Sequence, residues 1–223
     1  EPILKKLDNI HEMDAILASD EDGNPIEPEW PEADVAIGNP PFLGGKLLRS
    51  WIGDDQVNQI FELWDGRVAR ESDLCCYWFE KARAMIELGK LKRAGLLATQ
   101  GIRGGANRKT LDRIKETGDI FWAQSDRDWI LEGATVHVSM IGLDDGSEAE
   151  RELDGQPAQR INADLSAVTD LTSACTLPEN RSICLRSDEK GGPFDIDEET
   201  ARKMLGTGGN PNGRPNSDVV RPY

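Results

Sequence analysis

An Asn-Pro-Pro-Phe run, Asn39 to Phe42, directly follows the short apolar stretch ADVAIG (33–38). Asn39 offers a side-chain amide that accepts and donates hydrogen bonds, and Pro40 offers a backbone carbonyl stiffened by the ring of Pro41. Phe42 adds a flat apolar face. Two rigid acceptors beside an aromatic ring suit a planar base with an exocyclic amino group, whose nitrogen they would prepare to attack. The alternative is a turn that only ends a strand.

The elements that must position this run alternate between strands and helices. ADVAIG predicts a short buried strand, which leaves its sheet at Asn39 because proline is tolerated in neither a central strand nor a helix interior. Between Ser72 and Leu88, apolar residues recur at helical spacing; Ser72 or Asp73 can cap this helix and Gly89 can end it. Further strands are predicted at 93–99, 119–125 and 134–143, and a further helix over about 107–117.

This order of elements predicts an α/β fold with a mostly parallel sheet. The strands at 119–125 and 134–143 follow one another without a helix, which favours an antiparallel pair at the edge of the sheet. Residues 18–33 are rich in acidic residues, proline and glycine, and predict a solvated loop. After Gly146 the sequence turns polar, and its Gly-, Pro- and Asn-rich end predicts a loop or linker.

The net charge of −15 at first argues against nucleic-acid binding, which draws on lysine and arginine. The charge is unevenly distributed, however. Residues 38–130 carry 15 Lys or Arg against 13 Asp or Glu, so the acidic excess lies outside the stretch that contains the Asn-Pro-Pro-Phe run. Binding of nucleic acid by that stretch therefore stays possible on charge grounds.

The remaining composition argues for a soluble protein without a metal site. No apolar run approaches the roughly 20 residues that span a bilayer, and the first ten residues lack a signal-peptide pattern, so we expect a cytoplasmic protein with no membrane partner. Cys75, Cys76, Cys175 and Cys184 show no C-x-x-C spacing and are expected to be reduced structural thiols. The two histidines, His11 and His137, are too far apart to indicate a metal centre.

Three blocks of the sequence stand out together: ADVAIGNPPFLGGKLLR, DLCCYWFEKARAMIELGKLKRAGLLATQGIRGGANR and NGRPNSDVVRPY. They resemble consecutive blocks of the MmeI-like enzymes, which are DNA methyltransferases often fused to an endonuclease and a target-recognition domain. The resemblance implies a Rossmann-like fold that depends on S-adenosylmethionine, with residues 1–146 as the C-terminal part of the catalytic domain. Residues 147–223 would then be a polar extension and linker that leads into a target-recognition domain.

The resemblance also implies a reaction, the methylation of N6 of an adenine flipped out of double-stranded DNA in a restriction-modification system. It assigns catalysis to Asn39, Pro40, Pro41 and Phe42. Cofactor contacts are implied for Asn39, for Asp14 as the acceptor for the amino group of the cofactor's adenine, and for Asp73 and Leu74 at the mouth of the 72–88 helix. DNA contacts are implied for Arg103, Gly104, Gly105 and Arg108.

Plainer interpretations stand beside these assignments. Asp14 can be a solvated acid at a strand end, and the glycine-rich loop can be a turn with two exposed arginines. The side chains of Cys75, Tyr77, Trp78 and Phe79 are expected to pack in the core rather than touch a cofactor.

Two features of such methyltransferases are missing from the sequence. A glycine-rich turn for the methionine part of the cofactor and an acid for its ribose are not visible before Asn39. We therefore expect an internal fragment that is inactive alone and works with the remainder of its parent chain. Alternative functions are methylation of an RNA base or of a protein glutamine amide, whose enzymes usually carry Tyr in place of Phe42, and a non-catalytic DNA-binding module. The choice of adenine over cytosine rests on the resemblance alone.

Overall fold

The computed structural model describes residues 10–131, 134–168, 195–208 and 210–221. The chain divides into two compact units, Glu1–Ala174 and Cys175–Tyr223, which are described separately. Cys175 and Cys184 lie outside the described residues. No helix in the described ranges has the length and apolar character to cross a membrane.

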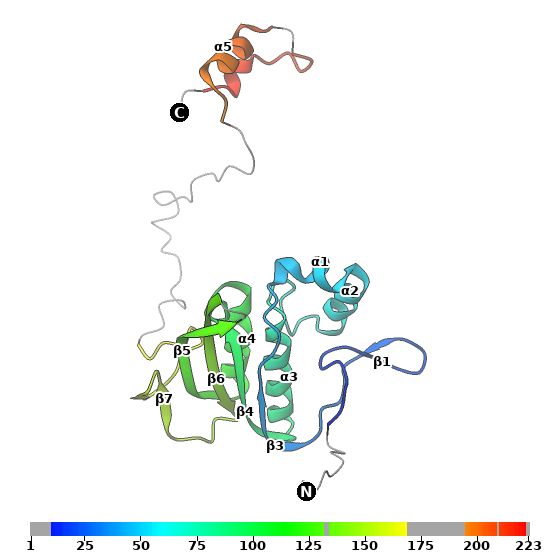
Figure 1. The fold of residues 1–223 in the computed structure, drawn as a ribbon, viewed down its shortest axis with the longest axis vertical. Coiled ribbons are helices and arrows are strands. Elements are labelled where there is room, and N and C mark those ends of the chain that lie inside the picture. Colours follow the sequence, from blue (N-terminus) through cyan, green and yellow to red (C-terminus); the bar gives the residue numbers. More distant parts are fainter. Residues whose placement is uncertain (1–9, 132–133, 169–194, 209, 222–223) are drawn as a thin grey trace, which may run out of the picture. The chain divides into compact units, whose positions relative to one another are not determined.

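The first unit is built on a six-stranded sheet with strand order β3-β4-β6-β5-β7-β8 (Figure 1). The strands are β3 (Ala33–Gly38), β4 (Leu91–Thr99), β5 (Asp119–Leu131), β6 (Ala134–Asp144), β7 (Arg151–Leu153) and β8 (Gln156–Ala158). The four strands predicted from the sequence are therefore present. The predicted solvated loop at 18–33 contains a small separate antiparallel pair, β1 (Ala18–Ser19) with β2 (Pro25–Ile26).

The sheet is mixed, and the expectation of a mostly parallel sheet was wrong. Only β3–β4 and β5–β7 are parallel, whereas β4–β6, β5–β6 and β7–β8 are antiparallel. The physical reason is that β5 and β6 follow one another without a crossover helix, and such strands can pair only in opposite directions. This antiparallel pair was predicted, but it lies inside the sheet because β7 and β8 continue beyond β5.

The strand β3 forms at the predicted residues but is not buried. The side chains of Val35 and Ile37 are 49% and 85% exposed. β3 lies at the edge of the sheet and has β4 as its only strand partner among the described residues. Its apolar composition therefore does not correspond to burial within this chain.

The longer helices α3 and α4 lie side by side against the sheet, with α3 over β4 and α4 next to β5 (Figure 1). The buried face of α3 includes Cys75, Tyr77 and Phe79, with Trp78 packed at the margin of the core, as predicted. Cys75 and Cys76 are free buried thiols. The helices of the first unit are η1 (Gly45–Leu47), α1 (Leu48–Ile52), α2 (Asp54–Leu63), α3 (Cys75–Glu87), η2 (Gln100–Arg103) and α4 (Gly105–Thr117).

The ends of α3 follow the sequence prediction only in part. Gly89 has φ +70° and its N–H donates to the Ile86 carbonyl, so glycine ends the helix as predicted. The N-cap residue is Leu74, and no side chain caps it. The expected cap by Ser72 or Asp73 was therefore wrong. The carboxylate of Asp73 is used elsewhere, as described below.

The core of the first unit extends past Gly146, where the sequence analysis places a domain boundary. The strand β7 joins the sheet beside β5, and Ile161 and Leu165 are fully buried. The assignment of residues 147–223 to an extension and linker stays a prediction.

The second unit contains α5 (Glu198–Gly206) and η5 (Asn216–Asp218). Asp197 caps α5 by accepting a hydrogen bond from the Thr200 N–H at 2.7 Å. The Asn216 side chain donates to the Met204 carbonyl at 2.7 Å and so joins the two helical segments.

A buried carboxylate, that of Glu80 on α3, holds the helices and a loop of the first unit together. Glu80 is fully buried and accepts hydrogen bonds from three arginines. Arg83 donates through Nε and Nη2 at 2.9 Å, Arg113 of α4 through Nε and Nη2 at 3.1 and 3.2 Å, and Arg67 through Nε at 3.1 Å. The Nη1 of Arg67 also donates a hydrogen bond to Oε2 of Glu27 at 2.5 Å. One carboxylate therefore binds the guanidinium groups of arginines from three parts of the fold.

We predict that Glu80→Gln destabilises the first unit by about 3–5 kcal/mol, because the new amide N–H groups face guanidinium donors and leave buried cations uncompensated. Urea unfolding followed by tryptophan fluorescence measures the change. The matched control is Glu87→Gln, which removes a half-exposed partner of Arg83 at 2.8 Å and should cost less than about 1 kcal/mol. Equal losses in the two variants would contradict the prediction.

The same carboxylate predicts a dependence of stability on pH. Burial raises the pKa of Glu80, but hydrogen bonds from Arg83 and Arg113 outweigh it and hold the pKa below its usual value. A lowered folded-state pKa gives stability that is present above the unfolded pKa of about 4.3 and is lost as pH falls through the folded pKa. The free energy of unfolding of the wild type should fall in this acidic range, and the fall should be smaller in Glu80→Gln.

Candidate active-site loop

The Asn-Pro-Pro-Phe run leaves the carboxyl end of β3. Pro40 is buried, Phe42 is half-buried, and Asn39 and Pro41 are exposed. The Asn39 side chain has no hydrogen-bond partner among the residues that the structure describes. The loop thus presents the amide group of Asn39 and the aromatic ring of Phe42 at the end of a strand, while Pro40 between them in the sequence is buried.

The residues that follow Phe42 fix this loop to the turn before α3. The Leu43 carbonyl accepts a hydrogen bond from the Leu74 N–H at 2.8 Å, and the Leu43 side chain packs against the core. The Gly45 N–H donates to the Asp73 carboxylate at 3.1 Å. Both Asp73 and Leu74, predicted cofactor contacts, therefore hold the loop; their contact with a cofactor stays a prediction.

Glycine at position 45 is required by the close approach of two backbone segments. A Cβ atom there would lie 2.3 Å from the carbonyl oxygen of Glu71 and 2.8 Å from that of Ser72. The neighbouring Gly44 has room, since its nearest atom would be an Asp73 oxygen at 3.7 Å. Sequence reasoning missed Gly45, although the paired glycines after the motif were a signal of close packing.

A second loop lies at the same end of the sheet, where β3 and β4 have their carboxyl ends. β3 and β4 are parallel neighbours with Gly38 opposite Leu96, so the loops that leave their carboxyl ends emerge side by side. The loop after β4 comprises η2 and the start of α4. It contains the four predicted DNA contacts.

These four residues differ in their surroundings. Gly104 and Gly105 are exposed, and Gly105 has φ +58°, a conformation that favours glycine. Arg103 donates from Nε to the Asp164 carbonyl at 3.0 Å and so holds a segment beyond β8. Arg108 lies 3.4 Å from Asp112 on the next turn of α4. All four follow the carboxyl end of β4, beside the carboxyl end of β3 that carries Asn39. DNA contact by them stays a prediction.

Asp14 lies before β1 and is exposed. Its Oδ1 accepts hydrogen bonds from the N–H groups of Ile16 and Leu17 at 2.9 and 3.0 Å, which closes a local turn. This pattern gives the carboxylate a structural use. The expected cofactor contact of Asp14 stays a prediction.

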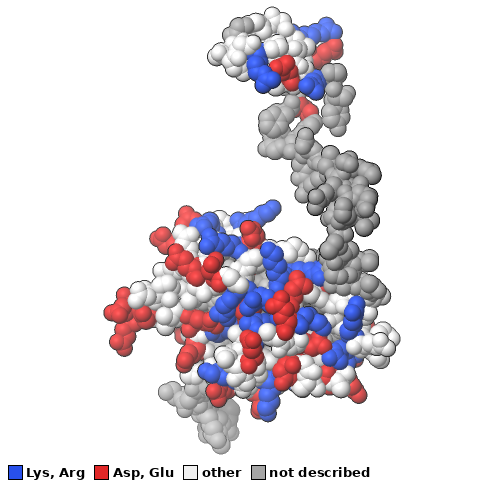
Figure 2. Space-filling model, turned by 180° about the vertical axis from the view of Figure 1, so that it is seen from behind, with Lys and Arg blue, Asp and Glu red and all other residues white. Residues whose placement is uncertain are grey.

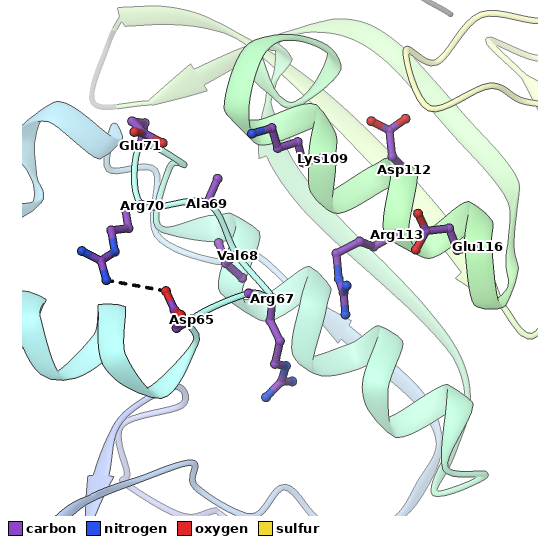
Figure 3. Close-up of a pocket in the computed structure, with 11 residues that line it drawn as sticks. Asp65, Arg67, Val68, Ala69, Arg70, Glu71, Lys109, Asp112, Arg113 and Glu116 are labelled. Atoms are coloured by element: carbon purple, nitrogen blue, oxygen red, sulfur yellow. Dashed lines mark ion pairs between the residues drawn. The ribbon is translucent and has the colours of Figure 1, made fainter.

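A separate cavity of about 500 Å³ lies between the loop after α2 and α4, and Figure 3 shows its lining side chains. Its cations and anions are equal in number, and Arg70 pairs with Asp65 at 3.5 Å. Arg67 and Arg113 are bound to Glu80. None of the predicted site residues lines this cavity. Its charged lining residues are Asp65, Arg67, Arg70, Glu71, Lys109, Asp112, Arg113 and Glu116.

Charges of both signs are interspersed over the face of the first unit drawn in Figure 2. Within the described ranges, no group of three or more His, Cys, Asp or Glu side chains is arranged to hold a metal ion. His137 is exposed, and its Nδ1 lies 2.7 Å from Asp126 Oδ1. The hydrogen bond to Asp126 raises the pKa of His137. This pair lies on β5 and β6, away from the predicted site residues in sequence.

We predict that Gly45→Ala displaces the loop, because the added methyl group would lie 2.3 Å from the Glu71 carbonyl oxygen and one of the two backbone segments must then shift. The control is Gly44→Ala, whose Cβ makes an ordinary contact. Amide hydrogen exchange measures the result: protection at Leu74 N–H, which bonds to Leu43, should fall in Gly45→Ala and persist in Gly44→Ala. Unchanged protection in both variants would show that the close approach is not a constraint.

Comparisons with known proteins bear on this loop and its fold. A family model for the DNA-methyltransferase domain of MmeI matches residues 4–154. No curated protein matches the chain. Among solved structures, the Type IIL restriction-modification enzyme MmeI in complex with DNA has 24% identity and a TM-score of 0.51, over 62% of this chain and 20% of that chain. A type I R-M system structure has 16% identity and a TM-score of 0.34, over 52% and 22%.

The present chain spans about a fifth of the length of the MmeI chain that it matches, and the likeness of the two structures shows a shared fold. The family match covers the Asn-Pro-Pro-Phe loop, the turn at Asp73 and the loop after β4, and it confirms the resemblance seen in the sequence. Since that match extends over more than half of its residues, the chain belongs to the family of the MmeI DNA-methyltransferase domain.

Proposed function

We propose that this chain carries the catalytic loop of a restriction-modification enzyme that methylates N6 of adenine in double-stranded DNA. The observation that carries the proposal is the placement of an exposed Asn39 and a half-buried Phe42 at the carboxyl end of β3, beside the loop that follows β4. Family membership supports DNA methylation, and the similar MmeI structure contains DNA.

The loop matches the requirements of an exocyclic amino group. The target base must leave the duplex stack, at a cost of a few kcal/mol, which stacking on Phe42 would partly offset. The Asn39 side-chain oxygen and the Pro40 carbonyl would then accept the two N–H bonds of the amino group. Because the buried Pro40 and the ring of Pro41 stiffen the backbone that carries both acceptors, the loop would stabilise the transition state with little reorganisation of its backbone.

The co-substrate of the proposal is S-adenosylmethionine, which when bound supplies an electrophilic methyl group. Asp14 is suited to the amino group of its adenine: the carboxylate is exposed, only Oδ1 closes the local turn, and carboxylate oxygens accept N–H bonds. Asn39 would lie beside the transferred methyl group, and Asp73 and Leu74 would border the cofactor through the turn that they form. The amino nitrogen would gain the methyl group as the sulfur–methyl bond breaks, with S-adenosylhomocysteine as the leaving group, and it would release one of its two protons to water.

The second loop would contact the DNA. Exposed backbone at Gly104 and Gly105 permits close approach of a phosphate, and Arg103 and Arg108 supply cations beside it. These contacts position the duplex and carry no sequence information, which we assign to a target-recognition domain of the enzyme.

We further propose that the reaction needs more protein than these 223 residues. The edge strand β3 supports this view: among the described residues it pairs only with β4, its Ile37 is 85% exposed, and unpaired edges with apolar side chains are commonly covered by further protein. The chain alone is then inactive, and calorimetry with S-adenosylmethionine should show no tight binding.

Asn39→Ala in the full-length enzyme should lower methyl transfer by about 10²–10³-fold, the typical cost of removing one preorganised hydrogen-bonding group. Mass spectrometry of digested DNA after incubation with S-adenosylmethionine measures N6-methyladenine. Thermal unfolding controls for folding, and it should not change because the Asn39 side chain is exposed and makes no hydrogen bond with described residues.

Other outcomes of this experiment distinguish the alternative functions. N4-methylcytosine in place of N6-methyladenine would keep the mechanism and change the base. No methylated base from a folded enzyme that binds the cofactor would exclude DNA as the substrate and direct the search to RNA bases or protein amides.

Phe42→Ala should lower kcat/KM by roughly 5- to 150-fold, which corresponds to the loss of about 1–3 kcal/mol of stacking on the flipped base. The matched variant Phe42→Tyr keeps the ring and should retain most of the activity. The same assay with varied DNA concentration measures both variants. Equal activity of the alanine and tyrosine variants would rule out stacking as the role of Phe42.

A further inference from the structure

The carboxylate of Asp73 lies where three segments of the first unit meet. Its Oδ1 accepts a hydrogen bond from the Gly45 N–H at 3.1 Å, in the segment that follows the catalytic loop. Its Oδ2 accepts from the Asn107 side chain on α4 at 2.9 Å, and the Thr99 hydroxyl at the end of β4 approaches to 3.4 Å. Both oxygens of the carboxylate are thus used within the protein.

Asn107 binds Asp73 in both directions. The Asn107 Nδ2 donates to the Asp73 carboxylate, and the Asn107 Oδ1 accepts from the Asp73 backbone N–H at 2.7 Å. Nδ2 also lies 3.4 Å from the Gly101 carbonyl of the second loop. A carboxylate has no donor and an amide has both groups, so only Asp at 73 with Asn at 107, or the exchanged pair, satisfies the bonds of the Gly45 N–H and the residue 73 N–H and the bond between the two side chains. The contact with the Gly101 carbonyl needs the amide at 107.

The two loops of the candidate site are joined through this pair. On one side, the Gly45 N–H and the Leu74–Leu43 hydrogen bond hold the segment next to Phe42. On the other side, Asn107 lies in the first turn of α4, directly after the glycines of the second loop. Pro40 and Pro41 stiffen the chain between Asn39 and Leu43, so a displacement at Gly45 is transmitted to the Asn39 amide.

We propose that Asp73 and Asn107 are positioning residues that hold the loops after β3 and β4 in fixed register, so that Asn39 and Pro40 keep the spacing required by one amino group. The inference rests on the proposed function. The pair touches neither the base nor the methyl group; it acts through Gly45 and the backbone of the catalytic loop. A misplacement of about 1 Å in such a loop costs about 10²-fold in rate.

The test exchanges the two residues. In Asp73→Asn, two amides face each other, and any flip of either leaves the N–H of Gly45 or of residue 73 opposite another donor. In Asn107→Asp, two carboxylates face each other. The double variant Asp73→Asn/Asn107→Asp restores the Gly45 bond, the bond between the side chains and the bond to the backbone N–H of residue 73.

In the full-length enzyme, each single variant should lower kcat by about 10- to 100-fold with KM for DNA changed less than about 3-fold, and the double variant should return kcat to within about 3-fold of wild type. A control is Asp145→Asn, which removes an exposed carboxylate just after the end of β6 that accepts the Ser147 N–H at 3.0 Å, and which should leave kcat unchanged. Single variants with wild-type kcat, or a double variant no better than the singles, would overturn the inference.

Amide hydrogen exchange of this chain separates the inference from the proposed function. Protection of the Gly45 and residue 73 amides should fall in the single variants and return in the double variant, whether or not the enzyme methylates DNA. A wild-type enzyme that makes no methylated base would refute the proposed function, while this exchange pattern would still support the role of Asp73 and Asn107 in holding the two loops. Unchanged protection in the single variants would refute that role even in an active enzyme.

Discussion

The parallel pairing of β3 with β4 is the constraint on which the candidate site depends. Parallel neighbouring strands have their carboxyl ends on the same side of a sheet. The loop after Gly38 and the loop after Thr99 therefore emerge together, although they are about 60 residues apart in the chain. The helix α3 lies between them in sequence and provides the crossover. The turn at Asp73, which precedes this helix, contacts both loops.

Two carboxylates of the first unit, those of Glu80 and Asp73, have different structural roles. Glu80 is fully buried and is surrounded by arginines from α3, α4 and the loop after α2, so it fixes the helices relative to one another. Asp73 lies nearer the surface and binds neutral partners, a backbone N–H and an amide. The Glu80 carboxylate stabilises the fold, whereas the Asp73 carboxylate holds the loops that follow β3 and β4.

Much of this fold could be predicted from the sequence because its signals are local. Apolar runs that end in Gly or Pro marked β3 and β4, and helical spacing marked α3. The antiparallel pairing of β5 with β6 was predicted, but the insertion of β6 between β4 and β5 depends on contacts between distant strands, and local periodicity does not contain this information. The same holds for α1 and α2, which the sequence analysis left unassigned.

The candidate site divides in the same way. The position of Asn39 and Phe42 directly after a strand was predictable from the apolar run and the two prolines, and their chemistry, unusual at the end of a strand, made them candidates. Asn107 was not, since an asparagine in the first turn of a helix is common and its partner lies 34 residues earlier. Asp73 was predicted as a helix cap or a cofactor neighbour, and only the three-dimensional arrangement shows that its carboxylate binds Gly45 and Asn107.

The exposed edge of β3 has a consequence for handling the chain. A strand with unpaired backbone groups and an exposed isoleucine is a template on which another extended segment can add. Asp34 is an exposed charged residue of this edge strand that pairs with Lys92 of β4 at 2.6 Å, and charged side chains on an edge strand oppose such addition. Solubility of the chain by itself is therefore a balance between backbone pairing and charge, and it should worsen with rising protein concentration and with salt that screens the charge.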